Sequence, residues 1–209
     1  MLNKAIEKKN FEIPIISGKN MLRLFIGLVI ASSLSSCSYN TLVEKREAVT
    51  AQWANVEAAY QRRADLIPNL VETVKAGGKY EQETLQKVVE ARASATSIKL
   101  DPSNLSDEDI ARYQAAQSQL SGSLSRLLAT VEAYPELLAV KGYSELRVEL
   151  ASTEDKIAFE RKKFNDLVNS YNANIATFPA LITAKMFGFT AKGYFKADAG
   201  TEKVPTVKF

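Results

Sequence analysis

The sequence predicts an all-α protein, an elongated antiparallel four-helix bundle with coiled-coil-like heptad packing. Three observations lead to this class. Apolar residues recur at alternating spacings of three and four along four long segments, as in helices that pack side by side. No segment alternates apolar and polar residues as a half-buried strand does. The connections between the segments are short, which favours antiparallel neighbours.

The first helical segment spans about residues 41–75 and carries the longest heptad seam. Gly77 and Gly78 follow it, as glycine commonly does at a helix C-terminus. Pro68 lies inside the segment and removes one main-chain hydrogen bond. The predicted seam consists of Val49, Trp53, Val56, Tyr60, Arg63, Ile67, Leu70 and Val74.

The second and third segments are separated by a loop of turn-forming residues. The second runs from about residue 80 to residue 97 and has a weaker apolar stripe with many alanines. The third begins after Ser106, a good N-cap residue, and carries acidic residues in its first turn. Pro135 ends it, and residues 135–143 are expected to form a short corner.

The fourth segment runs from about residue 144 to residue 178 and ends before Pro179. A short helical turn is expected over residues 181–186. The aromatic residues that follow are expected to fold back on the end of the bundle. The predicted helical bundle thus covers residues 37–195, and residues 196–209 are expected to form a flexible C-terminal tail.

The first 36 residues have the pattern of a bacterial lipoprotein signal peptide. Arg23 precedes an unbroken apolar run at residues 24–31, and the whole stretch of 13 residues from Leu22 to Leu34 is shorter than the ~20 that a membrane-spanning helix needs. Small residues follow the run, and the predicted cleavage lies between Ser36 and Cys37. Cys37, the only cysteine, would then carry diacylglycerol and a palmitoyl chain. An ordinary signal peptide with a chance cysteine is the alternative, and Met21 would give a signal of ordinary length if it is the true start.

The residues after position 36 include 22 basic and 22 acidic side chains, so the mature chain has no net charge. Nucleic acid is therefore not an expected partner, because binding it requires a basic stripe. Membrane attachment is expected to come from the lipid on Cys37. We expect a lipid-anchored protein of the cell membrane or outer membrane that faces the extracytoplasmic, periplasmic side; Ser38 in place of aspartate resembles lipoproteins sent to an outer membrane.

The composition argues against most catalytic chemistry. The chain contains no histidine, the commonest general base and metal ligand, and it has no glycine-rich phosphate loop. Carboxylates alone could hold a hard cation or work as an acid–base pair, but surface helices commonly carry such residues. We expect no catalytic residue, no metal site and no cofactor besides the covalent lipid. The carboxylates considered are Glu72, Glu132, Glu154 and Asp155.

Arg63 is the first candidate interaction residue, because it occupies a seam position where leucine or isoleucine is expected. A buried arginine needs a carboxylate partner, and Glu132 and Glu154 are the two candidates. The arginine could set the register as an ion pair, or it could bind an anion or orient a substrate. The same candidate interaction segment contains Arg62, Asp65 and Asn69.

The second candidate is a stripe of asparagines at Asn165, Asn169 and Asn172. Their spacings of four and three place them on one face of the fourth helix. Asparagine disfavours helix interiors, so three on one face need an explanation. They could line a polar groove or a partner site, or they could face solvent or bond to a neighbouring helix.

The chain carries, in order, the motifs YNTLV (39–43), RRADLIPNLVETVK (62–75), EAR (90–92), EAYPEL (132–137), EDKIA (154–158), FN (164–165), YN (171–172), FP (178–179) and FGF (187–189). Taken together, these motifs resemble the LemA family of bacterial envelope proteins. The resemblance extends over about residues 39–195 and implies a long antiparallel helical bundle outside the cytoplasmic membrane, with no established enzymatic activity. Members of the family are often membrane-anchored and encoded near other envelope proteins, including some with a TPM-type domain. The chain differs from the family in having a lipobox where many members keep a membrane helix.

The leading functional hypothesis is a lipid-anchored, non-enzymatic envelope scaffold that binds another envelope protein. One alternative is a ligand-binding, metal-binding or weakly catalytic bundle that uses Arg63 with carboxylates. Another is a structural bundle that self-assembles into homo-oligomers through its heptad seams.

Overall fold

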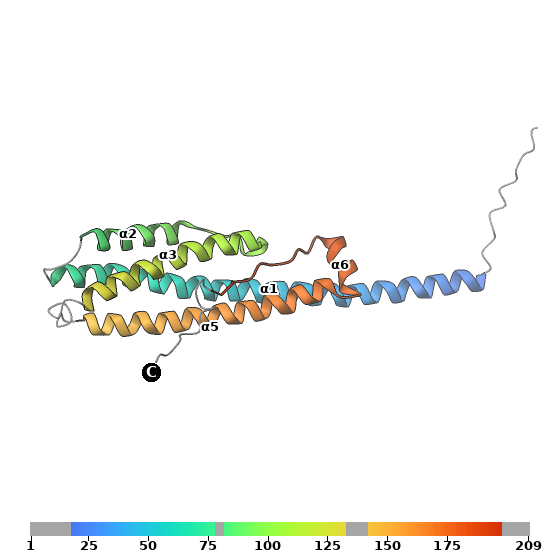
Figure 1. Ribbon diagram of the computed structural model, residues 1–209. Helices are drawn as coiled ribbons and strands as arrows, with labels where there is room; N and C mark the ends of the chain where they lie inside the picture. The colour runs from blue at the N-terminus through green and yellow to red at the C-terminus, as the bar shows by residue number, and fades with distance from the viewer. Residues whose placement is uncertain (1–17, 78–81, 133–141, 198–209) are drawn as a thin grey trace, which may run out of the picture.

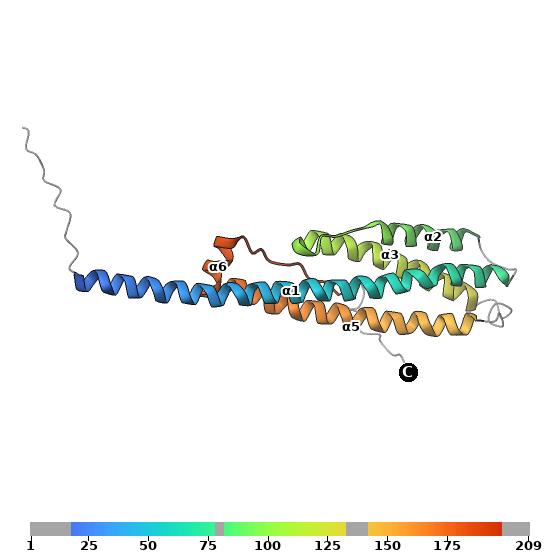
Figure 2. The same ribbon diagram turned by 180° about the vertical axis from the view of Figure 1, so that it is seen from behind.

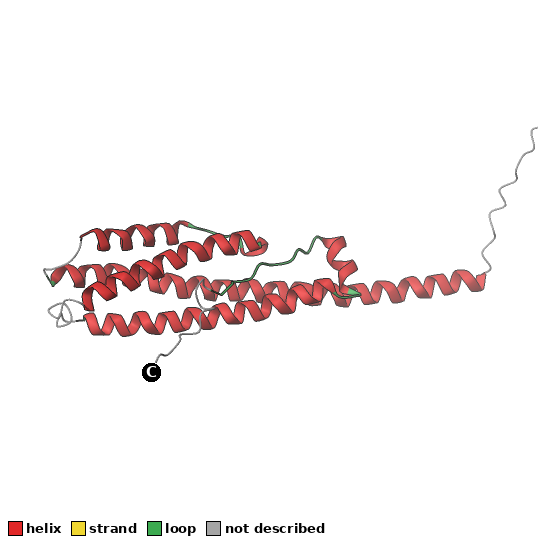
Figure 3. Cartoon of the chain, in the orientation of Figure 1, coloured by secondary structure: helices red, strands yellow, loops and turns green. Residues whose placement is uncertain are grey.

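The computed structural model describes residues 18–77, 82–132 and 142–197 of the chain. Every regular element in these ranges is helical, so the all-α class is confirmed (Figure 3). The elements are α1 (Gly18–Ala76), α2 (Gln82–Ser97), the 3₁₀ turn η1 (Pro102–Asn104), α3 (Asp107–Glu132), α5 (Tyr143–Ala176) and α6 (Ala180–Phe187). Residues 135–141 of the predicted corner at 135–143 and the tail from residue 198 lie outside the described residues, and Tyr143 is already part of α5.

The long helices α1 and α5 lie side by side along most of the molecule (Figures 1 and 2). At one end α2 and α3 pack against each other and cover the C-terminal half of α1. Toward the other end α1 and α5 continue as a pair, and α6 turns back onto both of them. Beyond α6, α1 projects alone toward the N-terminus (Figure 1).

The heptad seam of the first segment faces the interior, because each of its predicted residues is buried. Two groups of buried apolar residues make up most of the core. One lies among the ends of α1, α2, α3 and α5 and includes Leu70, Leu85, Leu124 and Leu150. The other is aromatic, lies nearer the middle of α1, and includes Trp53, Tyr60, Tyr113 and Phe164.

The predicted N-cap at Ser106 is confirmed. The Ser106 hydroxyl accepts a hydrogen bond from the main-chain N–H of Asp109 at 3.1 Å and donates one to the Asp109 carboxylate at 2.7 Å. This pairing satisfies a main-chain donor that the first turn of a helix otherwise leaves free. It also holds the pKa of Asp109 below its ordinary value.

The helix α1 extends much further toward the N-terminus than the heptad pattern predicted. It begins at Gly18 and passes through position 37 without interruption. Among the residues that the structure describes, none of the helices has the length and apolar content that crossing a bilayer requires. The signal peptide, its cleavage between Ser36 and Cys37 and the lipid on Cys37 stay predictions, since the Cys37 side chain lies outside the described part of the chain.

Residues 189–197, which we call the C-terminal strap, run back along the bundle after α6 (Figures 1 and 2). Aromatic residues of this region were expected to fold onto the end of the bundle. Phe187 does so, against Tyr39. Phe195 reaches further, because it stacks on Trp53 with ring centroids 6.0 Å apart and meets Phe164 edge-on at 5.5 Å.

Candidate functional site

Arg63 is buried, with 1% of its surface exposed, and it joins α1 to α3 and α5. Its guanidinium forms an ion pair with Glu154, the second of the two carboxylates proposed from the sequence. It also donates to the Ser121 hydroxyl at 2.6 Å and to the Gln117 side-chain oxygen at 2.8 Å. The arginine thus holds three helices together through one planar group.

The surroundings of Arg63 combine aromatic rings with one unused donor. The guanidinium carbon lies 5.3 Å from the centre of the Tyr60 ring, a cation–π contact. The Nε of Arg63 is buried and has no hydrogen-bond acceptor. Burial and the neighbouring Tyr60 raise the pKa of Tyr113, so this phenol stays protonated over the physiological range. A groove of about 550 Å³ opens beside the Arg63 and Glu154 side chains.

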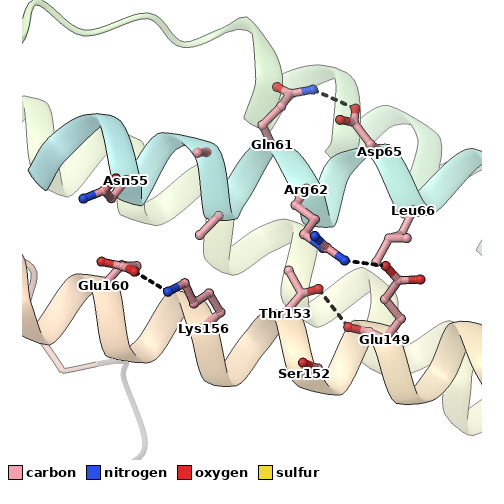
Figure 4. Close-up of a pocket in the computed structure, with 12 residues that line it drawn as sticks. Asn55, Gln61, Arg62, Asp65, Leu66, Glu149, Ser152, Thr153, Lys156 and Glu160 are labelled. Atoms are coloured by element: carbon pink, nitrogen blue, oxygen red, sulfur yellow. Dashed lines mark hydrogen bonds and ion pairs between the residues drawn. The ribbon is translucent and has the colours of Figure 1, made fainter. Parts of the chain in front are cut away.

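Arg62 belongs to a different surface from Arg63, although the two are adjacent in sequence. It is exposed and pairs with Glu149 of α5 at 3.0 Å. The pair lies in a groove of about 880 Å³ between α1 and α5 (Figure 4). We call this the α1–α5 groove. Figure 4 views it from the side away from α3, which passes behind the two helices.

The walls of the α1–α5 groove carry charges of both signs, and its apolar lining consists of Ala58, Ala59 and Leu66. Asp65 lies on the α1 wall and accepts a hydrogen bond from Gln61 at 2.7 Å. Lys156 pairs with Glu160 at 2.7 Å on the α5 wall. Glu160 is itself buried and accepts a hydrogen bond from Gln52 at 2.5 Å. These two donors, with Lys156 first, lower the pKa of Glu160.

The proline inside α1 is accommodated by an arginine of α2. Pro68 has no N–H, so the Ala64 carbonyl four residues earlier loses its helical donor. Arg92 supplies the missing donor, since its Nε lies 2.7 Å from the Ala64 oxygen. The motifs at residues 62–75 and 90–92 are therefore joined by this hydrogen bond between α1 and α2.

The remaining carboxylates considered from the sequence are separated from one another. Glu132 pairs with Arg147 at 3.2 Å, so it is not the partner of Arg63. Glu72 pairs with Lys75 on the same helix at 2.9 Å. Within the described ranges, no three acidic or cysteine side chains lie close enough together to hold a metal ion.

Two of the three asparagines in the predicted stripe hold the C-terminal strap. Asn165 donates to the Phe195 carbonyl at 2.8 Å and accepts from the Phe195 N–H at 2.9 Å. Asn172 forms the same two bonds with Lys192, at 2.8 and 2.9 Å. Asn169, between them, is exposed. The stripe is therefore divided between binding an internal segment and facing solvent.

A third carboxamide completes this arrangement from α3. Gln114 donates to the Lys196 carbonyl at 2.9 Å and accepts from its N–H at 3.0 Å. We call Gln114, Asn165 and Asn172, each of which pairs with both main-chain groups of one strap residue, the carboxamide clamp. Lys196, predicted to begin the flexible tail, is thus fixed by hydrogen bonds.

Lys192 and Gly193 lock the strap against the loop before α3. The ammonium group of buried Lys192 donates to the main-chain oxygens of Pro102 and Ser103. Its burial, and then the nearby Arg46, lower its pKa. Gly193 passes so close to the start of α3 that a Cβ there would lie 2.6 Å from the Asp107 nitrogen. Only glycine fits this position without movement of the main chain.

Sequence reasoning missed several residues that organise these contacts, chiefly Gln52, Arg92, Gln114, Gln117, Ser121 and Lys192. Most of them bind main-chain atoms or neutral side chains, which have no charge signature in a sequence. Gly193, directly after Lys192, was a possible signal of this contact, because glycine often stands where two main-chain segments approach closely.

The fold is an elongated all-helical one, with a long α1–α5 pair and a short α2–α3 pair. Residues of the sequence motifs contact one another across these helices. The family model of the LemA family matches residues 52–209, and the chain belongs to this family. The match covers both halves of the Pro68–Arg92 contact, the Arg63 ion pair and the carboxamide clamp.

Several named proteins are similar to this chain. Magnetosome protein MamQ 2 of Paramagnetospirillum magneticum (strain AMB-1) is 27% identical over 76% of this chain, which spans 64% of that relative's length. Magnetosome protein MamQ of Magnetospirillum gryphiswaldense is 25% identical, over 88% of this chain and 76% of the relative. Protein LemA of Metamycoplasma hominis is 24% identical, over 66% of this chain and 60% of the relative.

Proposed function

We propose that this protein is a lipid-anchored, non-enzymatic envelope scaffold that binds another envelope protein in the α1–α5 groove. The observation that carries the proposal is the groove itself, which runs between the two longest helices on the side that α3 does not cover (Figure 4). Its exposed walls belong to helices that are held from behind by Arg63 with Glu154, Ser121 and Gln117, which we call the Arg63 network. A rigid, preformed surface of this kind loses little conformational entropy on binding.

The lining of the groove suits a helix or a short polar segment of a partner. Small side chains at Ala58 and Ala59 allow close approach along α1. Arg62 and Lys156 offer cations, while Asp65 and Glu149 offer carboxylates. Such alternating charges give specificity and orientation more than affinity. The family resemblance suggests an envelope protein with a TPM-type domain as the partner.

Membrane attachment is the second part of the proposal. Membership in the LemA family, and relatives named as magnetosome proteins, support a membrane-associated protein. The lipid on Cys37 would provide the attachment, on the extracytoplasmic side of the cell membrane or outer membrane. Cys37→Ser is expected to release the protein from the membrane fraction with an unchanged helical circular dichroism spectrum. Quantitative retention of that variant in the membrane would contradict the lipid anchor.

We also propose that the helices form an antiparallel four-helix bundle with heptad packing. The burial of the whole α1 seam supports this architecture. The same pattern on α3, where Ile110, Leu120, Leu127 and Val131 are buried, supports it independently.

Site-specific photo-crosslinking in the full-length protein tests the groove. A photoreactive residue at Gln61 or at Ser152, both exposed groove positions, is expected to capture one protein in intact cells. The matched control is Gln86, an exposed position on α2 outside the groove. Arg62→Glu should abolish the Gln61 adduct while the protein stays folded. Identical adducts at Gln86, or none at either groove position, would refute the docking role.

The alternative function is anion or ligand binding at Arg63, favoured by its acceptor-free buried Nε beside the second groove. Arg63→Met separates the two functions. If Arg63 has only a structural role, Arg63→Met should change the free energy of unfolding by about 1–4 kcal/mol in either direction. The crosslink from Gln61 should be retained in this variant. A folded Arg63→Met protein that loses the crosslink while Arg62→Glu retains it would favour the ligand site.

A further inference from the structure

The strongest feature not used by the scaffold proposal is an apolar surface on and around α6. Phe178, Ile182, Met186 and Phe187 are each more than half exposed. The opposite side of α6 is buried, since Ala180 and Ala184 pack against Leu42 of α1. The short helix is thus anchored by small residues and directs its large apolar side chains outward. Contiguous exposed apolar residues of this kind mark protein or membrane contacts.

We infer that this surface, which we call the α6 patch, lies on the lipid bilayer. The inference rests on the proposed anchoring at Cys37, and the position of α6 supplies the argument. Tyr39 contacts Phe187 and Phe189, with ring centroids 4.9 and 5.8 Å apart. Tyr39 is only two residues from Cys37, about 3 Å along a helix. Acyl chains on Cys37 would therefore bring the membrane surface to the level of α6.

The charges near the α6 patch suit a membrane surface. Residues 177–191 contain no aspartate or glutamate, and Lys185 is their only charged residue. Lys185 is exposed and adjacent to Met186, so its stem can lie along the apolar surface while its ammonium reaches lipid phosphates. Tyr39 is partly exposed beside it, and tyrosine is favoured at the level of lipid headgroups.

A second copy of the chain is the competing occupant of the α6 patch. The proximity of the patch to Cys37 and the lack of acidic residues at 177–191 favour the bilayer over it. The bundle has another exposed apolar residue, Val148, near the far end of α5. Val148 is 28 residues from the end of α5 at Ala176, about 42 Å along a helix. It therefore has similar exposure to the α6 patch but no proximity to the anchor, which makes it a matched control.

Tryptophan fluorescence in vesicles tests the inference. The one natural tryptophan, Trp53, is fully buried and gives a constant background. Ile182→Trp, Met186→Trp and the control Val148→Trp would be introduced singly into the full-length lipidated protein. Each protein is reconstituted into phosphatidylcholine–phosphatidylglycerol vesicles, with or without brominated acyl chains. Brominated lipid is expected to quench the added emission at positions 182 and 186 at least twofold, and to leave position 148 unchanged.

The outcomes distinguish the patch from the anchor. If the proteins sediment with vesicles but position 182 is not quenched, the patch does not lie on lipid and the anchor stands. Equal quenching at position 148 would also overturn the inference, because the whole bundle would then lie on the membrane. Failure to sediment with vesicles would refute the anchor itself and, with it, the basis of the inference. A blue shift without vesicles that grows with protein concentration would assign the patch to a second copy.

Discussion

The Arg63 network and the carboxamide clamp both hold separate parts of the chain together, but they use different chemistry. Both join elements that are distant in sequence through polar side chains. Arg63 and Gln117 of the network are buried, whereas the residues of the carboxamide clamp are partly exposed. The network uses a buried cation that needs one carboxylate, Glu154. The clamp uses neutral carboxamides that bind main-chain groups of the C-terminal strap. The network thus depends on the chemical identity of its partner, whereas the clamp depends on the path of the main chain.

The largest expected effect is on the charged side of this comparison. Glu154→Ala should lower the free energy of unfolding by about 3 kcal/mol, because it leaves the buried Arg63 cation without a carboxylate. Glu149→Ala is the matched control on the same helix. Its partner Arg62 is 69% exposed, so the loss should stay below about 1 kcal/mol. Urea denaturation of both variants measures the difference, and equal losses would mean that burial of the arginine does not matter.

The clamp should be most sensitive at Gly193, where the strap passes closest to α3. Gly193→Ala is expected to cost about 2 kcal/mol, because the added Cβ forces main-chain atoms apart. Gly122→Ala is the control, since nothing lies within 4 Å of its added Cβ in α3. It should stabilise the protein by up to about 1 kcal/mol. Hydrogen exchange of the strap amides should increase only in the position-193 variant; a rigid strap there would contradict the close-approach argument.

A single-atom change in the clamp tests its dependence on main-chain pairing. Asn172→Asp keeps the acceptor for the Lys192 N–H but places a second oxygen against the Lys192 carbonyl. The expected loss is about 1–2 kcal/mol at neutral pH, and it should shrink in acid, where a protonated carboxyl can donate again. Asn169→Asp, on the same helix but exposed, should change stability by less than about 0.5 kcal/mol. Thermal melts of both variants at neutral and acidic pH measure these changes in stability.

The smallest expected effect comes from Glu160, which combines the two chemistries. Lys156 and the Gln52 carboxamide lower its pKa from the ordinary value of 4.5. A lowered folded-state pKa stabilises the protein above the unfolded value, and this contribution is lost as the pH falls through the folded value. Glu160→Gln should therefore reduce the loss of stability below about pH 4.5, by about 1 kcal/mol or less. Urea unfolding at pH 7 and pH 3 compares the two proteins; an unchanged acid loss would exclude Glu160 as a contributor.

The comparison also explains which parts of the structure the sequence could predict. Heptad spacing located the helical segments, and Ser106 marked the start of α3, because both signals are local. The Arg63–Glu154 pair was among two proposed because a buried cation needs an anion, and few anions lie beside a seam. Asn165 and Asn172 of the clamp stood out as part of a stripe, but their partners could not be predicted, because a main-chain partner leaves no mark on residue types. Arg92 was missed for the same reason: its acceptor is the carbonyl that Pro68 leaves without a donor.

The start of α1 shows a different limit of sequence reasoning. A heptad seam marks only the part of a helix that packs against another helix. The seam begins near residue 49, so the predicted segment begins only a little before it, at about residue 41. The structure continues α1 to Gly18, beyond the part that α5 and α6 cover. The seam cannot report this extension, because it records packing against a neighbouring helix.

The continuity of α1 fixes the distance between Cys37, the proposed lipid site, and the α1–α5 groove, the proposed docking site. Arg62 lies 25 residues beyond Cys37 on one uninterrupted helix, which corresponds to about 37 Å of rise. If the proposed lipid on Cys37 holds α1 upright on the bilayer, the groove would stand at that height above the lipid, roughly the thickness of a membrane. The proposed partner would then need a folded domain that extends well above the membrane. Shortening α1 by whole turns would lower the height at which the two proteins meet.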